Sequence, residues 1–365
     1  NTAILSHSRI YGAAPSGFWL PESGYYPGLE RHLKMNGIKY FFTAAHGLLF
    51  ADPKVPYGVY TPAACPNGVC AFGRDVPSSH AVWSAEEGYP GDVSYRDFYR
   101  DIGFDLPLDY IRPWIHDNDI RINTSYKYHA ITGNTDEKKP YVPEKARRKA
   151  DEHADNFLYN RLRQVTKLNG LMDRAPVIVC PYDAELFDHW WFEGPIWIES
   201  LLRKIHESGD RLELITPSDY LSRYPENPEA LPAFSSWGNN GFAEVWLDGS
   251  NDWIYRHIHK AIDRMCKLVE RFPNVDGLKL RALNQAAREV LLTQASDWPF
   301  IMKTGTTVPY AIARVKEHLR NFSTIYEGLC SNSVNTEWLT KMERKNNLFG
   351  DIDYRLFSPA KKVVQ

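Results

Sequence analysis

Three side chains that can transfer protons or attack carbon closely follow apolar runs of this sequence. Glu22 comes after GFWL, His46 ends the run KYFFTAAH, and Asp183 comes after PVIVCPY. In parallel α/β folds, reactive groups lie where strands end and loops begin, so these side chains should meet at one rim of a sheet. Two carboxylates at such a rim suffice for glycoside chemistry. One attacks the anomeric carbon or supports a water molecule, and the other protonates the leaving oxygen.

Each carboxylate also has a purely structural interpretation, in which Glu22 caps a turn and Asp183 caps the helix that follows it. The neighbourhood of Asp183 favours a functional role, because the segment PYDAELFDHWWFEGPIWI mixes acidic, imidazole and indole side chains more than a core segment requires. These side chains are Glu185, His189, Trp190, Trp191, Glu193 and Trp197. Helix capping does not account for the three tryptophans.

Strands and helices that would position these groups alternate along the first part of the chain. Short apolar runs predict strands at 17–20, 38–46, 175–186 and the start of 211–221. Helical periodicity and the usual start and stop residues predict helices at 28–37, 144–172, 195–208 and after Thr216. Segment 52–150 is rich in Pro, Gly, Tyr and Asp, which is typical of long functional loops. After a proline-rich linker at 224–233, residues 251–350 are predicted to be almost wholly helical.

This alternation predicts an α/β fold, with a mostly parallel sheet or barrel and a helical C-terminal region. We expect two domains, a catalytic one at 1–225 that includes the loops at 52–150, and a helical one at 226–365. About four strands are convincing, whereas a closed barrel needs roughly seven or eight. The others would lie unrecognised within 52–150 or before Asn1, where the chain begins NTAILSHSRIYG without an initiator Met, a cap signal or a targeting pattern.

Composition excludes several classes of partner. The formal net charge is −2, from 43 Lys and Arg against 45 Asp and Glu, which argues against nucleic acid and against a polybasic membrane sensor. No apolar stretch approaches the length of a spanning helix, so we expect a cytoplasmic protein. The five cysteines are expected to be reduced thiols without a zinc site. The 11 Trp, 21 Tyr and 17 Phe include aromatic faces suited to stacking on sugar rings.

Longer motifs strengthen the interpretation of the two carboxylates. WLPESGYYPGLE resembles the nucleophile motif, and YDAELFDHWWFEGP the acid motif, of glycoside hydrolase family 57. VWSAEEGYPGD, YRDFYRDIGFD, SSWGNNGFAEVWLDGSNDWIYRHIH and LLTQASDWPFIM agree with that family, with greatest likeness to its 1,4-α-glucan branching enzymes. By position in these motifs, Glu22 matches the catalytic nucleophile and Asp183 the general acid/base. The resemblance implies a seven-stranded β/α barrel, a helical C-terminal domain that helps to close a glucan cleft, and no metal or organic cofactor.

Two departures from the family pattern stand out. Asp188 occupies a position that is usually glycine, which adds a negative charge near Asp183 and affects either the ionisation of that acid or the loop backbone. The family's opening barrel strand would lie before Asn1, so we expect residues 1–365 alone to hold an incomplete barrel that needs an N-terminal segment to fold and work.

Five further residues are candidates for substrate binding. Trp237 and Trp246 resemble the cleft tryptophans of the family, against an interpretation as core aromatics, and His46 resembles a cleft residue, against a satisfied core histidine. Arg96 and Gln294 either bind glucose hydroxyls or form a structural ion pair and a buried amide, respectively. No residue is expected to bind a metal.

The resemblance implies a 1,4-α-glucan branching enzyme, with a role in glycogen biosynthesis and an α-glucan such as amylose, glycogen or starch as its substrate. Glu22 would form a glucosyl ester that a 6-hydroxyl then attacks. An α-amylase or a 4-α-glucanotransferase of the same family would use the same two carboxylates. An inactive glucan-binding remnant is the alternative from a different class.

Overall fold

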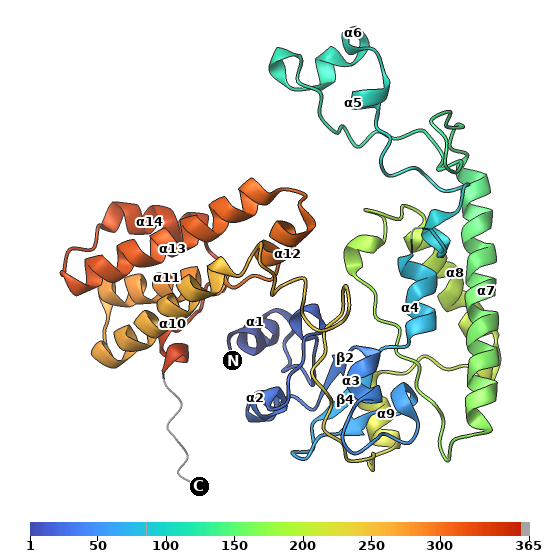
Figure 1. Ribbon diagram of the computed structural model, residues 1–365, viewed down its shortest axis with the longest axis horizontal. Helices are drawn as coiled ribbons and strands as arrows, with labels where there is room; N and C mark the ends of the chain where they lie inside the picture. Colours follow the sequence, from blue (N-terminus) through green and yellow to red (C-terminus); the bar gives the residue numbers. More distant parts are fainter. Residues whose placement is uncertain (85, 359–365) are drawn as a thin grey trace. The chain divides into compact units, whose positions relative to one another are not determined.

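The chain passes back and forth between two units, each with its own core (Figure 1). The computed structural model describes residues 1–84 and 86–358. Unit 1 combines Asn1–Asp52, Ala64–Ala71 and the chain from Ala230 onward, whereas unit 2 combines Pro53–Ala63 and Phe72–Glu229. The expected domains at 1–225 and 226–365 are contiguous in sequence, and they stay a prediction.

The N-terminal part of unit 1 carries the short strands that precede Glu22 and His46. Its elements are α1 (Thr2–Tyr11), β1 (Gly17–Phe18), α2 (Leu29–Met35), β2 (Tyr40–Thr43) and α3 (Ala45–Leu49). β1 and β2 are parallel, and a Cβ atom on Gly17 would lie 2.1 Å from the ring of Tyr40 opposite, so a larger residue there would displace that ring. The helix expected at 28–37 is confirmed, and the strands expected at 17–20 and 38–46 are confirmed over β1 and β2 only. The second expected strand ends at Thr43, and His46 lies in helix α3. Helix α1 was not expected, because its sequence has no cap signal and Asn1 makes no side-chain cap.

The sheet has four strands in the order β1-β2-β4-β3, where β3 is Ala63–Ala64 and β4 is Cys70–Gly73. Both added strands lie in the segment that was expected to form loops. They were missed because they are short and flanked by Pro and Gly, although β4 is buried throughout. The strands expected at 175–186 and 211–221 are wrong. The first of these segments reaches its neighbours only through single contacts, such as the Arg74–Val179 bridge and the Val177 N–H bonded to the Tyr60 carbonyl.

The α/β class is thus confirmed, with one small sheet in the part of the chain that the structure describes. The C-terminal part of unit 1 is helical, as expected, and comprises α10 (Trp253–Arg271), α11 (Gly277–Thr293), α12 (Asp297–Thr304), α13 (Val308–Cys330) and α14 (Thr336–Lys345). Figure 1 shows α11 between α10 and α13, and α11 contacts both of them. Even the carboxylate of Glu289 on α11 is fully buried, where His318 Nδ1 lies 2.7 Å away.

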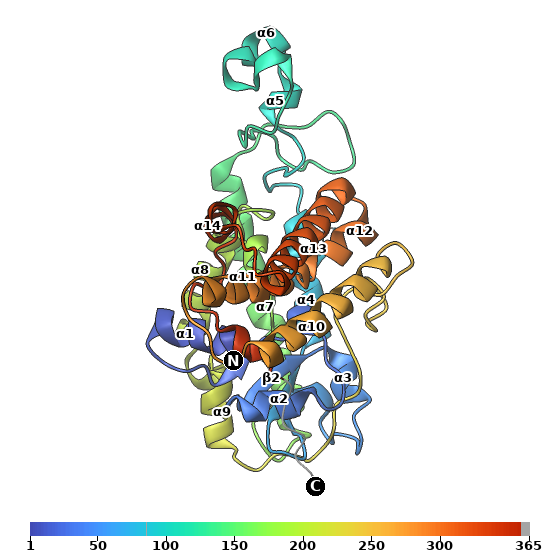
Figure 2. The same cartoon turned by 90° about the vertical axis from the view of Figure 1, so that its left-hand side faces the viewer.

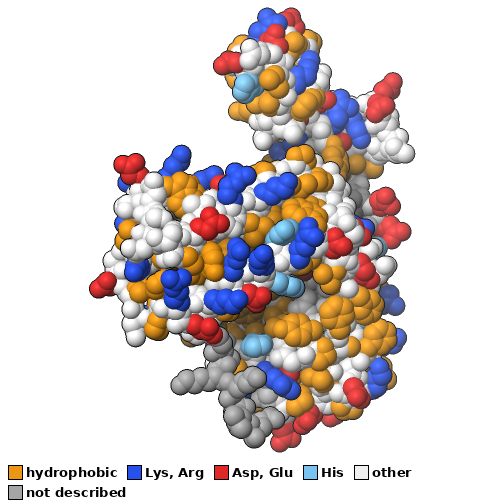
Figure 3. Space-filling view, turned by 60° about the vertical axis from the view of Figure 1, so that its left-hand side comes forward, with side chains coloured by type: hydrophobic (Ala, Val, Ile, Leu, Met, Phe, Trp, Pro, Cys, Tyr) orange, Lys and Arg blue, Asp and Glu red, His pale blue; other side chains and the backbone are white. Residues whose placement is uncertain are grey.

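Amphipathic spacing explains how α10 is oriented within this helical region. Its buried side chains recur every three or four residues and include Ile254, Ile258, Ala261, Met265 and Leu268. Its exposed charged side chains follow the same spacing on the other face and include Arg256, Lys260, Asp263, Lys267 and Glu270. Figure 3 shows charged side chains of both signs over the helical region.

Unit 2 is built around two packed helices. Its helices are α4 (Val76–Trp83), α5 (Ile102–Asp105), α6 (Leu108–Ile111), α7 (Pro143–Asn169), α8 (Gly194–Glu207) and α9 (Pro217–Arg223). The long α7 presents Ala146, Ala150 and Ala154 to α8, and the small side chains allow close packing. Figures 1 and 2 show α5 and α6 beyond one end of α7. The helices expected at 144–172, 195–208 and after Thr216 are confirmed.

The sequence favours a functional role for Trp191 and Trp197 over simple packing in a core. In the structure, both side chains belong to the core of unit 2. They are 2% and 1% exposed, and their ring centroids lie 5.5 Å apart. The concentration of tryptophan around the acid motif therefore reflects packing at these two positions.

All five cysteines are free thiols, and among residues 1–84 and 86–358 no three or more His, Cys, Asp or Glu side chains gather as metal ligands would. Within the same residues, no helix has the length and apolar character needed to cross a membrane.

Candidate active site

Glu22 lies in a single 3-10 turn, Pro21–Ser23, directly after the chain leaves β1. Its backbone is left-handed, with φ 56° and ψ 24°, and the following Ser23 has a φ of 50°. Two successive non-glycine residues in this conformation are strained, and such strain persists only where the surroundings hold it. One holding contact is the Trp237 backbone N–H, which donates to the Glu22 carbonyl oxygen at 3.0 Å.

Two neutral donors fix the Glu22 carboxylate. The indole Nε1–H of Trp237 donates to Oε2 at 2.7 Å, and the hydroxyl of Ser296 donates to Oε1 at 2.7 Å. Both donors come from distant parts of the sequence, so capping of the local turn does not explain this carboxylate. Its two oxygens are oriented by the C-terminal part of unit 1.

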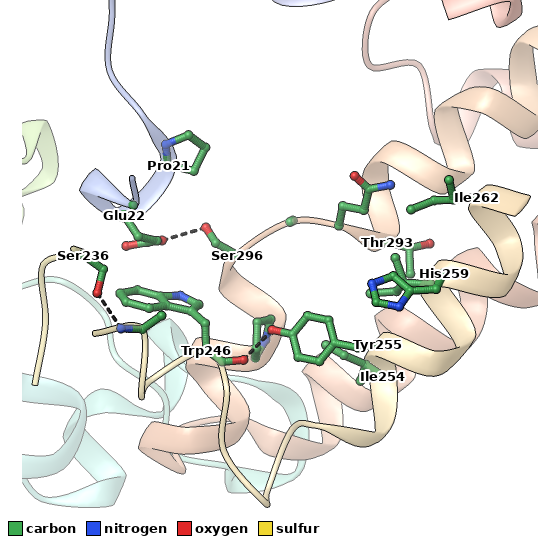
Figure 4. Close-up of a pocket in the computed structure, with 16 residues that line it drawn as sticks. Pro21, Glu22, Ser236, Trp246, Ile254, Tyr255, His259, Ile262, Thr293 and Ser296 are labelled. Carbon is green, nitrogen blue, oxygen red and sulfur yellow. Dashed lines mark hydrogen bonds between the residues drawn. The ribbon is translucent and has the colours of Figure 1, made fainter. Parts of the chain in front are cut away.

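The carboxylate opens into a pocket of about 390 Å³ that lies wholly within unit 1 (Figure 4). Such a volume is in the range of small-molecule sites. The wall formed by α10 is mostly apolar, with Ile254, Ile258 and Ile262, whereas Thr293 and Gln294 at the end of α11 add polar groups. An apolar wall beside a carboxylate and a few polar groups suits a sugar ring, which has apolar faces and a polar edge.

Trp246 lines this pocket and carries an unused donor. The side chain is only 8% exposed, and its Nε1–H has no hydrogen-bond partner among the described residues. A buried donor without a partner is costly, and most such groups in folded proteins are paired. The N–H has almost no accessible surface, so the hydroxyl of a ligand in the pocket could accept from it only after the surrounding side chains shift.

His46 stabilises a neighbouring loop and is not among the pocket-lining residues. Its Nε2 lies 2.7 Å from the carbonyl oxygen of Gly241, and its ring packs against Phe242. A Cβ atom on Gly241 would lie 2.6 Å from His46 Cε1, and the φ of +92° there also requires glycine. His46 thus supports the loop that carries Ser236, Trp237 and Trp246.

Asp183 belongs to unit 2 and takes the N-cap position of a 3-10 turn, Ala184–Leu186. Its carboxylate makes no capping hydrogen bond to this fully described turn, so the capping interpretation does not hold. Arg74, which directly follows β4, interacts electrostatically with Asp183, and two opposing effects act on the pKa of its guanidinium. Burial lowers the pKa of Arg74, and the negative charge of Asp183 counteracts that lowering.

Arg96 also belongs to unit 2, where its guanidinium carbon lies 3.6 Å from the centroid of the Phe192 ring. Its backbone N–H donates to Glu193 Oε1 at 3.1 Å. Glu193 is completely buried, and burial raises the pKa of its carboxyl group. Among the residues that the structure describes, the Arg96 guanidinium is thus stacked on an aromatic ring and makes no salt bridge of the kind that was its structural alternative.

Asp188 has a φ of 74°, a left-handed conformation that glycine adopts without a steric cost. Its backbone N–H donates to the Trp191 carbonyl oxygen at 2.9 Å, which closes the loop after Asp183. Asp188 therefore holds this loop in a conformation that is strained for a residue with a Cβ atom.

Unit 1 brings together four of the expected site residues, Glu22, Trp237, Trp246 and Gln294, with His46 supporting the adjoining loop. Asp183 and Arg96 are placed by unit 2.

Sequence reasoning missed Ser296 and Arg74. Ser296 lies two positions after Gln294 in a segment that was already singled out, and Arg74 follows the buried run CAFG, so each carried a weak signal.

Comparison with known families gives this arrangement its context. The model described as glycosyl hydrolase family 57 matches residues 6–232, more than half of the chain. The chain belongs to glycosyl hydrolase family 57. A second model, described as the C-terminal domain of 1,4-alpha-glucan branching enzyme, matches residues 257–357. Glu22 and Asp183 lie in the first matched segment, and Ser296 lies in the second.

Relatives within the family carry two kinds of name. The chain is 30% identical to a 1,4-alpha-glucan branching enzyme of Thermococcus kodakarensis, over 95% of this chain and 53% of that protein. The chain thus spans about half the length of this relative. The solved structure of AmyC, an alpha-amylase of Thermotoga maritima, is 42% identical with a TM-score of 0.90, covering 98% of this chain and 68% of that one. A branching enzyme of Pyrococcus horikoshii has a TM-score of 0.86 at 30% identity, over 99% of this chain and 67% of that one.

Proposed function

We propose that this chain carries the catalytic residues of a retaining glucan branching enzyme, which cleaves α-1,4-glucan and transfers the cut chain to a 6-hydroxyl. The observation that carries the proposal is the Glu22 carboxylate, held by two neutral donors at the edge of a sugar-sized pocket. The match of residues 257–357 to a branching-enzyme domain supports branching over other activities of the family.

In the proposed reaction, Glu22 attacks the anomeric carbon and the bond to the departing O4 breaks, while Asp183 gives its proton to that oxygen. The product is a glucosyl ester on Glu22. Asp183 then takes the proton of an incoming 6-hydroxyl, whose oxygen attacks the anomeric carbon and releases the carboxylate. The same residue acts as acid and then as base, so no metal or organic cofactor takes part in these steps.

The substrate-binding roles follow from the same proposal. Trp237 and Trp246 bind the glucan in the pocket together with Gln294, His46 holds the loop that carries the tryptophans, and Arg96 binds glucan from unit 2. We further infer that β1 and β2 belong to a seven-stranded β/α barrel, of which residues 1–225 form a portion, followed by a helical domain at 226–365. The matched segments 6–232 and 257–357 support that division. A role in glycogen biosynthesis and a cytoplasmic location stay expectations from the sequence.

A hydrolase is the second candidate, because the 42% identity to AmyC links the chain to a protein named as an alpha-amylase. Amylose incubated with the full chain separates the activities. Branching produces α-1,6 linkages, detectable by NMR and by debranching, with few new reducing ends. Hydrolysis produces reducing ends without branches, and glucanotransfer redistributes α-1,4 chain lengths. Binding without any change of the glucan would indicate an inactive glucan-binding protein. Any of these last three results would contradict the proposal.

Two variants test the assigned roles. Glu22→Gln keeps the shape of the side chain and removes the nucleophile, so turnover should fall by more than about a hundredfold while amylose binding is retained. Asp183→Asn should lose turnover to a similar degree. In a substrate complex, the two carboxyl groups should lie about 5–5.5 Å apart, and a separation of about 6.5–9.5 Å would indicate inversion and contradict transfer through an ester.

A further inference from the structure

Ser296 occupies a position at which serine usually has a different task. It is the residue before α12, and serine hydroxyls at such positions normally accept a hydrogen bond from the first amides of the helix. Here the backbone is helical, with φ −64° and ψ −21°, and the hydroxyl makes no capping bond to α12, all of which the structure describes. The hydroxyl instead donates to Glu22 Oε1, 274 positions away in the sequence.

The two hydrogen bonds to Glu22 together define the plane of its carboxylate. Trp237 and Ser296 donate to different oxygens, so rotation of the carboxylate about its terminal bond would break both bonds. Each oxygen of an ionised carboxylate has about two lone-pair sites, so one donor per oxygen leaves a lone pair for attack. Both donors are neutral, and they hold the carboxylate without placing a cation beside it.

We infer that Ser296 is a positioning residue for the Glu22 nucleophile, and that its hydroxyl sets the orientation from which Glu22 attacks the anomeric carbon. This inference rests on the proposed function, because it assumes that Glu22 forms the covalent ester. The backbone of Glu22 is strained, so the direction of its side chain depends on contacts from elsewhere in unit 1. Ser296 supplies the contact to the oxygen that Trp237 does not reach.

Orientation of a nucleophile affects the rate of its attack more than the affinity for the substrate. A hydrogen bond to a charged group contributes enough that its loss should lower kcat by about 10- to 100-fold. KM should stay within about twofold, because the pocket walls remain. A residue that only supported the fold would change the thermal stability and would not separate kcat from KM in this way.

The test uses Ser296→Thr and Ser296→Val in the full chain, since these two side chains have nearly the same shape and differ in a hydroxyl against a methyl group. We expect the Thr variant to keep kcat within about threefold, and the Val variant to lose about 10- to 100-fold. Ser296→Ala, which adds no bulk, should behave as the Val variant does. Thermal unfolding of all three should stay close to that of the unchanged chain, because the hydroxyl does not cap α12.

A second measurement separates this inference from the proposed function. A fluorinated α-glucosyl fluoride forms a slowly hydrolysed ester with a retaining nucleophile, because the C1–F bond breaks, fluoride leaves and a C1–O bond forms. Mass spectrometry should show this label on Glu22, formed about 10- to 100-fold more slowly in the Val variant than in the Thr variant. Equal labelling rates in the two variants, or equally slow labelling in both, would overturn the role of the Ser296 hydroxyl alone. Turnover without any label on Glu22 in the unchanged chain would overturn the proposed function, and this inference with it.

Discussion

At the scale of single residues, the pocket beside Glu22 combines a strained backbone with a hydrogen-bond donor that has no partner among the described residues. The backbone at Glu22 is left-handed, and the indole N–H of the nearby pocket residue Trp246 is buried without a partner among the described residues. Features of both kinds are unfavourable in a protein that only has to fold, and they concentrate at sites where a ligand binds or reacts. Both lie at the same pocket, which favours that pocket as the place of glucan binding.

Trp246→Phe tests the unpaired donor. The substitution keeps an aromatic ring but removes the N–H, so we expect maltooligosaccharides to bind about tenfold more weakly, as loss of one hydrogen bond implies. Thermal stability should change little, because removing an unpaired buried donor offsets part of the lost packing. Calorimetric titration and a thermal scan measure the two effects. An unchanged affinity would show that the N–H does not contact the ligand.

Asp188→Gly tests the strained loop after Asp183. Glycine adopts a φ of 74° without a steric cost, so the variant should gain up to about 1 kcal/mol in the free energy of unfolding. Asp188→Ala is the matched control, because it removes the same charge and keeps a Cβ atom in the strained conformation. Denaturant unfolding compares them. If both variants shift the stability equally, charge and not backbone strain is the consequence of this substitution.

At the scale of elements, the loop that carries Trp237 and Trp246 depends on its contact with His46. Gly241→Ala would place a Cβ atom 2.6 Å from His46 Cε1 at a φ of +92°. The loop should shift, and the hydrogen bond from Trp237 to Glu22 with it, so turnover should fall by about tenfold or more. Gly249→Ala is the control, because no atom lies within 4 Å of its added Cβ atom. Equal turnover in both variants would show that the loop position is not critical.

Regular elements were predictable where the periodicity is long. Helix α7 and the helices of 251–350 repeat their apolar residues over many turns. The bounds of α7 were predicted nearly correctly, and 251–350 was predicted to be almost wholly helical. Strands β3 and β4 have two and four residues, too few for an alternation to stand out. The segment before Asp183 has the composition of a strand but lacks a continuous partner. Its residues 176–182 are only half-buried, so the apolar run predicted neither full burial nor a continuous strand ladder correctly.

The candidate site was predictable only in part. Glu22, Trp237 and Trp246 follow from motifs, because each lies in a long segment that resembles the family. The bond from Ser296 to Glu22 joins residues 274 positions apart, and no local pattern contains that information. The serine also had an ordinary explanation as a helix cap, which the structure excludes.

At the scale of the whole molecule, the stability of unit 2 should depend on pH through Glu193. Burial raises the pKa of this carboxyl above the ordinary value of 4.5, so the folded chain keeps a proton that the unfolded chain has released. The stability contribution is complete below pH 4.5 and is lost as the pH rises towards the folded pKa. Glu193→Gln cannot ionise, so its stability should fall less over that window.

Thermal unfolding between about pH 4 and 7 measures this difference. Glu185→Gln serves as the control, because Glu185 lies in the same segment and is exposed. Its pH dependence should match that of the unchanged chain. A Glu193→Gln variant with the same pH dependence as the unchanged chain would show that Glu193 is already ionised in the folded state.

The interleaving of the two units has a consequence for synthesis on the ribosome. Unit 2 lies between Pro53 and Glu229, whereas the bonds that hold Glu22 span 215 and 274 positions. Nascent domains fold as units while the chain emerges, and long-range contacts form late because closing such loops is entropically costly. Unit 2 can therefore fold while α10 to α14 are still being translated. The Glu22 carboxylate gains its second hydrogen bond only when Ser296 has left the exit tunnel. A nascent chain that ends earlier contains the proposed nucleophile without the hydroxyl that orients its Oε1.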